Sequence, residues 1–415
     1  MRVLMLGWEF PPFFAGGVGM VCYELTKALS QKAHITYIMP FGPDQVTNQQ
    51  HVKLLIASNF FKGHSFTVKG IPTLLHAYQS SSEYNDHYAR HAQLFSRAGK
   101  SAGRDNTHTL YGRNLLEEVY RFALQVQLIA EQEDFDIIHA HDWTTFPAAL
   151  AVKRSTGKPL VVHIHITEFD KSGGAGANPD VYAIEKAGMD GANSVIAISN
   201  YVKNSIIRNY GIPPEKIRVV HNAGSSMSDL EYRSELNKKG KIVLFTGRIT
   251  LQKGPEYFVY AAKKVLEHYH DVTFVMAGTG DMLARMIELT AHLGIAKHFV
   301  FPGFYTRDDA EKLFSMADVF VMPSVSEPFG IVPLEAMVKR TPTIISKQSG
   351  VSEIVNHCFK VDFWDIDQLA NKIISLLHYP SLHETMTEQG YHEAKRLTWD
   401  SPADKCMAIY ATLVQ

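Results

Sequence analysis

Two cationic residues, Arg248 and Lys253, lie close together in one short segment, residues 246–254. This segment directly follows an apolar run that is typical of a buried strand. A guanidinium can bind a phosphate through two hydrogen bonds, and an ammonium acts as a compact positive charge. The pair therefore suits a diphosphate leaving group. A solvated surface pair is the alternative interpretation.

Two glutamates flank a glycine after another apolar run, residues 319–322. Glu327 lies in the loop, Gly330 lets the backbone turn, and Glu335 follows Glu327 by about two helical turns. The first N–H groups of the helix expected there would face an anion. A carboxylate beside phosphates is repelled unless it binds hydroxyls or stabilises positive charge, which indicates a sugar or ribose. The alternative is a capping glutamate and an exposed one.

Two His-x-His pairs end two successive expected strands, His139 with His141 and His163 with His165, and Asp142 follows the first pair. Alternation along a strand places both imidazoles of a pair on one face, so a metal site is one interpretation. A metal site also needs a further ligand, and nothing else in the sequence has ligand spacing. We therefore expect no metal and a structural histidine in each pair. His165 or Asp142 is expected to bind a polar substrate.

Two glycine turns also follow expected strands. Gly16 and Gly17 open a helix, where backbone N–H groups can approach an anion, although a plain tight turn explains them equally well. Their spacing is neither that of a dinucleotide fingerprint nor that of a Walker loop. Gly278 and Gly280 form half of such a fingerprint, whose third glycine is replaced by Leu283.

These residues all follow short apolar runs that alternate with helical patterns. Continuous apolar runs are typical of parallel strands covered on both faces, and strand–helix–strand repetition predicts doubly wound α/β units. The expected strands are residues 2–6, 34–39, 136–141, 159–166, 194–199, 217–221, 242–246, 273–277, 299–302, 319–322 and 342–346. The expected helices include residues 19–30, 115–131, 255–268, 309–316, 368–377 and 402–413.

The length of 415 residues suits two such domains. A polar linker, residues 223–240, separates an expected domain over 1–222 from a second over 241–399. Residues 80–114 read as an insertion in the first domain, and the last helix, within 400–415, is expected to return to that domain. Ligands bind beyond the carboxyl ends of parallel strands, so we expect both sets of loops to face one central cleft.

Charge and composition exclude several classes of protein. The 41 Lys and Arg residues balance 42 Asp and Glu residues, which argues against bulk-charge binding to nucleic acid or to an anionic membrane. Cys22, Cys358 and Cys406 are too sparse for a disulfide framework or a cysteine-ligated zinc site. The start has no export signal, and no apolar run approaches the roughly 18 residues of a membrane span. We therefore expect a cytoplasmic protein.

Taken in order, these motifs resemble those of retaining glycosyltransferases of family four, which have the GT-B fold of two Rossmann-like domains. Residues 327–335 resemble their two-glutamate signature, and the cations of residues 248–253 match their phosphate-binding pair. The His-Asp-Trp of residues 141–143 and the context of His165 are similar to bacterial glycogen and starch synthases. The loop of residues 14–17 lacks the lysine found in those synthases, which puts ADP-glucose as the donor in doubt.

The resemblance implies transfer of a hexose, with glucose favoured, from a nucleotide sugar of the UDP- or ADP-glucose type. The acceptor would be a hydroxyl, with an α-glucan as one candidate, and neither a metal nor another cofactor is implied. Arg248 and Lys253 would neutralise the departing diphosphate. Glu327, His165 and Asp142 would act at the sugar. The implied donor-binding residues are Gly16, Gly17, Asn222, Gly278, Gly280, Tyr305, Phe329, Gly330, Ile331 and Glu335.

Three other functions stay open at this point. A sugar-nucleotide epimerase uses a similar two-domain fold and would interconvert donor sugars without an acceptor. A non-enzymatic two-lobed sugar-binding protein would bind without turnover. A metal hydrolase would use the two His-x-His pairs.

Overall fold

A computed structural model describes residues 1–12, 17–42, 51–60, 115–171, 176–224, 227 and 240–414 of the chain. Gly16, the expected insertion at 80–114 and most of the expected linker at 223–240 lie outside the described residues. Among the described residues, no helix has both the length and the apolar character needed to cross a membrane.

The chain forms two compact units. Unit 1 consists of Met1–Ile198, Val202–Val220 and Trp399–Gln415. Unit 2 consists of Ser199–Tyr201 and His221–Thr398. The last segment of the chain is therefore part of the same unit as the first.

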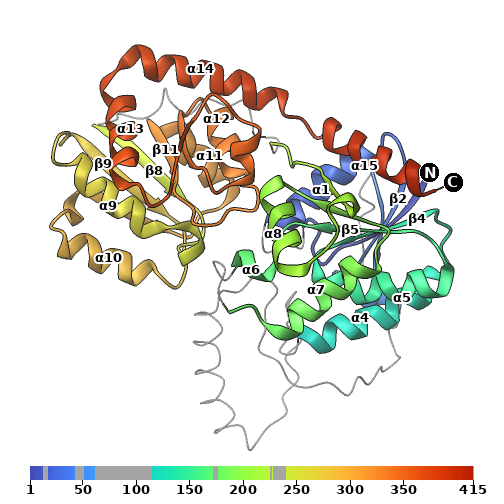
Figure 1. Cartoon of the computed structure of the whole chain (residues 1–415). Coiled ribbons are helices and arrows are strands. Elements are labelled where there is room, and N and C mark those ends of the chain that lie inside the picture. The colour runs from blue at the N-terminus through green and yellow to red at the C-terminus, as the bar shows by residue number, and fades with distance from the viewer. Residues whose placement is uncertain are drawn as a thin grey trace, which may run out of the picture. The chain divides into compact units, whose positions relative to one another are not determined.

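Unit 1 is built on a seven-stranded parallel sheet with the strand order β3-β2-β1-β4-β5-β6-β7 (Figure 1). Strands β4 and β5 lie inside the sheet and are buried along their whole length, which explains why they read as continuous apolar runs. The strands are β1 Arg2–Leu6, β2 His34–Met39, β3 Lys53–Ile56, β4 Ile137–His141, β5 Leu160–Ile164, β6 Ser194–Ala197 and β7 Ile217–Val219.

Helices cover this sheet. They are α1 Gly17–Leu29, α2 Ala57–Phe60, α4 Leu115–Ala130, α5 Phe146–Thr156, α6 Glu168–Lys171, α7 Pro179–Gly191, α8 Asn200–Tyr210 and α15 Asp400–Leu413. The terminal helix α15 packs against α1, and Lys32 forms an ion pair with Asp404 of α15 (Figure 1). Tyr410 of α15 is fully buried and contributes to the core of unit 1.

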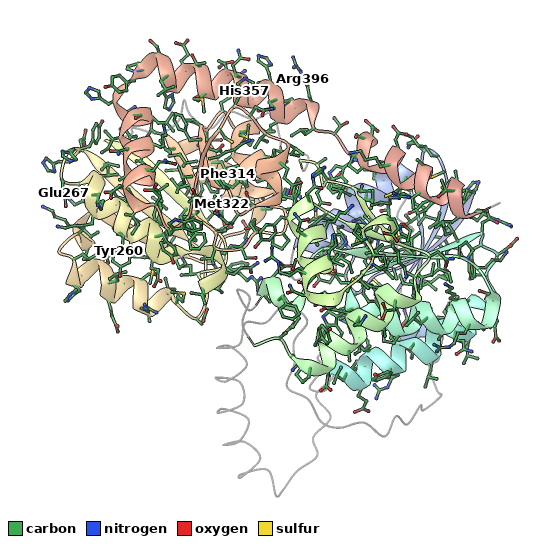
Figure 2. The ribbon with its side chains drawn as sticks, in the orientation of Figure 1. Tyr260, Glu267, Phe314, Met322, His357 and Arg396 are labelled. Carbon is green, nitrogen blue, oxygen red and sulfur yellow. The ribbon has the colours of Figure 1, made fainter. Side chains whose placement is uncertain are left out.

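Unit 2 has a six-stranded parallel sheet with the order β10-β9-β8-β11-β12-β13. Its strands are β8 Lys241–Thr246, β9 Val272–Ala277, β10 Phe299–Gly303, β11 Val319–Met322, β12 Thr343–Ser346 and β13 Phe359–Val361. Its helices are α9 Pro255–Val265, α10 Leu283–His292, α11 Arg307–Met316, α12 Val332–Val338, α13 Ile366–His378 and α14 Pro380–Arg396. Phe314 and Met322 lie inside this unit, whereas Glu267 and Arg396 lie on its surface (Figure 2).

The predicted α/β class is confirmed, and each expected strand corresponds to a strand of the structure. Two short edge strands, β3 and β13, were not expected, because four and three residues are too few to show a pattern. The strand expected over 159–166 is shorter, since β5 ends at Ile164. His165 therefore lies just beyond the strand, where the chain begins to turn.

Candidate active site

The two His-x-His pairs come together in one buried cluster in unit 1. Strands β4 and β5 pair in parallel with His141 opposite His163, which brings the two pairs side by side. Ring centroids lie between 4.4 Å, for His163 and His165, and 5.3 Å, for His139 and His163. All four side chains are buried. We call these four residues the imidazole cluster.

Hydrogen bonds link the imidazole cluster in two pairs. His139 Nε2 lies 3.2 Å from His163 Nδ1, and His141 Nδ1 lies 2.8 Å from His165 Nε2. His139 Nδ1 is also bonded to the hydroxyl of Tyr410. Burial lowers the pKa of His139 and of His165 to about 3. It lowers the pKa of the other two rings well below their ordinary value, with added repulsion from neighbouring imidazoles. All four rings are therefore neutral near pH 7.

Asp142 connects the ends of β4 and β5 in a strained conformation. Its φ of 56° and ψ of 168° lie in a region that is nearly restricted to glycine. Its N–H donates to the carbonyl of His163 at 3.0 Å, and its Oδ1 accepts from the N–H of His165 at 2.8 Å. Its carbonyl accepts from the N–H of Thr145 at 3.1 Å. The carboxylate of Asp142 therefore fixes the main chain of His165. These are the two residues that the sequence offered for binding a polar substrate.

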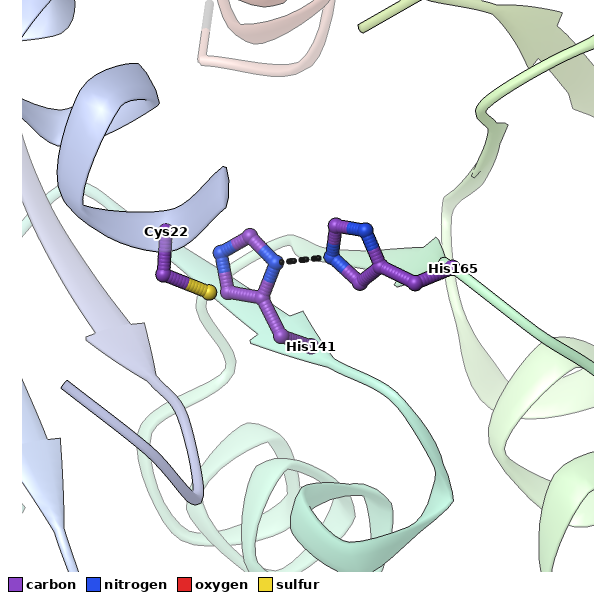
Figure 3. A group of neighbouring side chains, drawn as sticks. All are labelled: Cys22, His141 and His165. Atoms are coloured by element: carbon purple, nitrogen blue, oxygen red, sulfur yellow. Dashed lines mark hydrogen bonds between the residues drawn. The ribbon is translucent and has the colours of Figure 1, made fainter. Parts of the chain in front are cut away.

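Cys22 of α1 adjoins the imidazole cluster. The potential ligand atoms of Cys22, His141 and His165 all lie within 4.8 Å of one another (Figure 3). A second group with the same spacing consists of His139, His141 and His163. Cys22 has no ligand spacing to the histidines in the sequence, because it comes from a helix far away that the fold brings to the strand ends. The expectation that no metal binds stays a prediction.

Two other predicted residues are placed as follows. Gly17 is the first residue of α1 and is exposed. A Cβ atom added there would meet no atom within 4 Å, so packing gives no reason for this glycine. Asn222 is buried and is grouped with unit 2, whereas the sequence placed it at the end of the first domain.

Unit 2 brings Lys253 and Glu327 together. Lys253 lies in the short helical turn Leu251–Lys253 after β8, and its Nζ is 2.5 Å from Glu327 Oε2. The hydroxyl of Ser324 donates to the same carboxylate oxygen at 3.1 Å. The two side chains are mostly buried, with 21% and 8% of their surface exposed. Arg248, from the same loop as Lys253, is exposed.

The glycines after β9 support the loop that carries Arg248. A Cβ at Gly278, whose φ is 139°, would lie 1.8 Å from the carbonyl oxygen of Gly247. A Cβ at Gly280 would lie 2.3 Å from the carbonyl oxygen of Ile249. These two positions must be glycine for the two strand-end loops to approach. This close approach accounts for the partial dinucleotide fingerprint without any ligand.

The Glu-Pro-Phe-Gly segment is fixed through its main chain. The N–H of Glu327 donates to the carbonyl of Gln348 at 3.0 Å, and the buried Phe329 accepts at its carbonyl from Val351 at 2.7 Å. Gly330 has a φ of 92°, in the left-handed region that favours glycine. Ile331 then precedes α12. The segment therefore holds the Glu327 carboxylate in one place.

Tyr305 and Glu335 lie near each other in unit 2. Burial raises the pKa of Tyr305, and the nearby carboxylate of Glu335 raises it further. Tyr305 follows β10, and Glu335 lies on α12. The structure thus brings together two residues that were expected to face the nucleoside.

Sequence reasoning missed two supporting residues. Ser324 is the second residue after β11 and bonds Glu327, and its position after a buried strand was a usable signal. Tyr410 bonds His139 from the last helix, and no local pattern distinguishes it from the apolar residues around it.

Family models match most of the chain. The model for Glycosyltransferase Family 4 matches residues 89–223, and the model for Glycosyl transferases group 1 matches residues 228–393. An uncharacterized glycosyltransferase of Methanocaldococcus jannaschii is 29% identical, over 99% of this chain and 98% of its own length. The glycogen synthase of Mycobacterium tuberculosis is 25% identical, over 86% of this chain and 80% of its own length.

Solved structures share the fold. Sucrose-phosphate synthase from Thermosynechococcus elongatus matches with a TM-score of 0.73 and 19% identity, covering 99% of this chain and 98% of that chain. HepE of Anabaena, solved in complex with UDP-glucose, matches with a TM-score of 0.66 and 18% identity over the full length of both chains. Two parallel Rossmann-like units with these neighbours define the GT-B fold. With the family matches, the chain is a glycosyltransferase of this class.

Proposed function

We propose that the protein transfers a hexose, with glucose favoured, from a nucleotide-diphosphate sugar to a hydroxyl acceptor, with retention at the anomeric carbon. The observation that carries the proposal is the Lys253–Glu327 pair, in which Lys253 comes from the loop after β8 that also carries Arg248, and Glu327 comes from the loop after β11. Together the two loops offer cations for a diphosphate and a carboxylate for sugar hydroxyls. A glycogen synthase among the relatives and a sucrose-phosphate synthase among the structural neighbours support this donor chemistry.

The proposed reaction breaks the bond between the anomeric carbon and the phosphate oxygen, and the electron pair leaves with the nucleoside diphosphate. Arg248 and Lys253 stabilise that developing charge, which is the largest contribution expected of the protein. The acceptor oxygen attacks from the same face, and its proton passes to the departing phosphate oxygen. Glu327 positions the sugar while its carboxylate holds Lys253.

The remaining predicted residues take supporting roles in this proposal. His165 and Asp142 belong to the sugar side, and Gly17 offers its N–H at the start of α1. The donor-binding set is completed by Gly16, Asn222, Gly278, Gly280, Tyr305, Phe329, Gly330, Ile331 and Glu335. An α-glucan, as in glycogen synthesis, is the acceptor proposed first.

A donor screen tests the proposed function. UDP-, ADP- and GDP-sugars are incubated with the protein, nucleotide release is measured, and α-glucans and other acceptors are then added. Release that increases with an acceptor, together with a glycosylated product of retained configuration, is the expected result. Interconversion of the sugar without an acceptor would instead identify an epimerase, and tight binding without turnover would identify a binding protein.

We also propose that transfer needs no metal ion, because two cationic side chains serve the diphosphate. Turnover in excess EDTA is expected to equal turnover in buffer without added metal. Loss of turnover in EDTA that returns only with Mg²⁺ or Mn²⁺ would contradict this part of the proposal and leave the transfer itself standing.

A further inference from the structure

Three aromatic side chains form a patch at the strand ends of unit 2. Tyr257 lies in the first turn of α9, and Phe363 and Trp364 follow β13. The ring centroid of Phe363 lies 5.1 Å from that of Tyr257 and 4.8 Å from that of Trp364. The angles between the ring planes, 69° and 85°, are those of edge-to-face contacts. We call these three residues the aromatic patch.

Trp364 is the exposed member of the aromatic patch. It is 57% exposed, whereas the other three tryptophans of the chain, Trp8, Trp143 and Trp399, are at most 8% exposed. An edge-to-face contact occupies one side of a ring, so much of the indole stays open to solvent. A single exposed apolar residue needs no explanation, but an indole supported by two further rings is a rigid apolar surface of the kind that marks a binding site.

A tight turn presents the indole. The N–H of Asp365 donates to the carbonyl of Asp362 at 2.9 Å, which closes a four-residue turn with Phe363 and Trp364 at its central positions. Small and polar residues usually occupy such positions. The turn therefore holds a large aromatic ring toward solvent, where it gains little from packing in the core.

Hydrogen-bonding side chains border the aromatic patch. The carboxylate of Asp362 accepts from Lys347 Nζ at 2.8 Å and from Gln348 Nε2 at 3.0 Å. The N–H of Lys347 donates to the carbonyl of Val361 at 2.8 Å, so the segments after β12 and β13 are joined. The ammonium and the carboxylate neutralise each other, and both reach solvent. This border therefore suits a neutral polar ligand better than an anion.

The aromatic patch adjoins the loops that carry Lys253 and Glu327. The carbonyl of Gln348 accepts from the N–H of Glu327 at 3.0 Å. Gly254 directly follows Lys253, and a Cβ atom added to it would lie 3.1 Å from a ring atom of Tyr257. Ligands bind beyond the carboxyl ends of parallel strands. The patch therefore lies at the ligand-binding edge of unit 2.

A carbohydrate fits this combination of groups. One face of a pyranose ring presents C–H groups with a small positive charge, which the electron-rich face of an aromatic ring attracts. The hydroxyls around the sugar ring can donate to a carboxylate and accept from an ammonium or an amide. A protein helix or a lipid surface would instead need a broader apolar face than one exposed ring.

We propose that the aromatic patch, together with Lys347, Gln348 and Asp362, is a binding site for a glucan chain. A sugar unit of the chain stacks on Trp364, and its hydroxyls bond the polar border. The site rests on the proposed function only in the choice of an α-glucan as the ligand. Under that function it would hold part of the acceptor chain against unit 2.

Iodide quenching of tryptophan fluorescence in the full-length protein tests the proposal. Iodide quenches exposed indoles, and Trp364 is the one exposed indole among the four tryptophans, all of which lie in the described part of the chain. We expect maltoheptaose to protect this fluorescence from iodide in a saturable way. Glycerol at the same concentration of hydroxyl groups is the control and is expected to give no protection.

Matched variants locate the bound glucan. Isothermal titration calorimetry with maltoheptaose is the measurement, because it needs no indole. Trp364→Ala is expected to weaken binding about tenfold, whereas Trp364→Phe keeps an aromatic face and is expected to retain most of the affinity. Tyr379→Ala removes an aromatic side chain that is also 57% exposed, at the end of α13, and is expected to bind like the wild type.

Two results would overturn the site. One is wild-type fluorescence that maltoheptaose does not protect, and the other is Trp364→Ala that binds the glucan as tightly as the wild type. The Tm of Trp364→Ala checks that the variant is folded, as expected for an exposed position. These measurements use no sugar donor, so their failure would leave the proposed function standing, and a failed donor screen would leave the glucan site standing.

Discussion

At the scale of single residues, the pairing of Lys253 with Glu327 defines the candidate donor site. The carboxylate accepts from the ammonium at 2.5 Å and from Ser324 at 3.1 Å, so the lysine is held in place before any phosphate binds. Positioning a charge in advance lowers the reorganisation needed when a leaving group develops charge. The same ion pair is partly shielded from water, which strengthens its electrostatic interactions.

Removing either cation tests this role. Lys253→Ala and Arg248→Ala are each expected to lower turnover about 100- to 1000-fold, because the charge of the leaving diphosphate is no longer stabilised. Steady-state nucleotide release from the donor identified in the screen is the measurement. Lys264→Ala, which removes a surface lysine of α9 that pairs with Asp367 of α13, is the control and is expected to retain activity. Unchanged turnover in both test variants would refute the assignment.

At the scale of elements, the loops after parallel strands are held by contacts between strand ends. The loop after β8 approaches the loop after β9 so closely that Gly278 has no room for a Cβ atom. The end of β4 is joined to the residue after β5 through Asp142. The last helix, α15, reaches β4 through Tyr410 and His139. Each of these contacts fixes candidate site residues at the strand ends relative to the sheet.

Substitution of Gly278 tests the loop contact in unit 2. Gly278→Ala is expected to displace the Arg248 loop, because the added Cβ would lie 1.8 Å from the carbonyl oxygen of Gly247. We expect a raised KM for the donor and a lower Tm. Gly294→Ala is the matched control, since its φ is 71° but no atom lies within 4 Å of the added Cβ. It is expected to cost only about 1 kcal/mol, from backbone strain. Equal effects of both variants would argue against the loop contact.

Removal of one hydroxyl tests the attachment of α15. Tyr410→Phe is expected to destabilise unit 1 by about 1–3 kcal/mol, because Nδ1 of the buried His139 loses its partner. The urea midpoint followed by tryptophan fluorescence measures the change. Tyr379→Phe, which alters a tyrosine that is 57% exposed in unit 2, is expected to leave the midpoint unchanged. A Tyr410→Phe midpoint equal to that of the wild type would show that the hydroxyl contributes nothing to stability.

At the scale of the whole molecule, two parallel sheets each carry their own core, and the chain returns at its end to the unit where it began. Four neutral imidazoles lie in the core of unit 1. Their protonation is coupled to unfolding, because the rings gain access to water and recover an ordinary pKa of about 6.5 only when the unit opens. The free energy of unfolding of unit 1 in acid is therefore expected to depend on these four imidazoles.

This coupling predicts how stability depends on pH. The folded pKa values lie below the unfolded ones, so the unfolded chain binds more protons as the pH falls below about 6.5. Stability is fully present above that pH and is lost progressively toward pH 3, by up to about 1.4 kcal/mol per pH unit for each ring. Urea midpoints between pH 7 and pH 5 measure the slope.

A variant pair isolates the contribution of the imidazole cluster. His163→Gln removes one buried imidazole and is expected to reduce the pH slope by about one proton. His268→Gln, at an exposed position in unit 2, is expected to leave the slope unchanged. Identical slopes in His163→Gln and in the wild type would show that the cluster does not titrate on unfolding.

The sequence alone determined the class of fold and the residues most suited to the chemistry. Continuous apolar runs such as β4 and β5 identify buried parallel strands, because a strand that is covered on both faces has apolar residues at consecutive positions. Lys253 and Glu327 could likewise be picked out, since each follows such a run and parallel strands end at one edge of a sheet. The short edge strands β3 and β13 carry too few residues for any local pattern to reveal.

Only the tertiary structure decided which distant residues meet. Cys22 and Tyr410 come from the first and last helices and reach the imidazole cluster because strand order and helix packing bring α1 and α15 to β4. The backbone of Asp142 takes its unusual conformation where it is held by hydrogen bonds with His163 of β5, with His165 just after β5 and with Thr145. Local periodicity arises from interactions a few residues apart. Contacts between distant segments depend instead on strand order, register and packing, which no short stretch of sequence specifies.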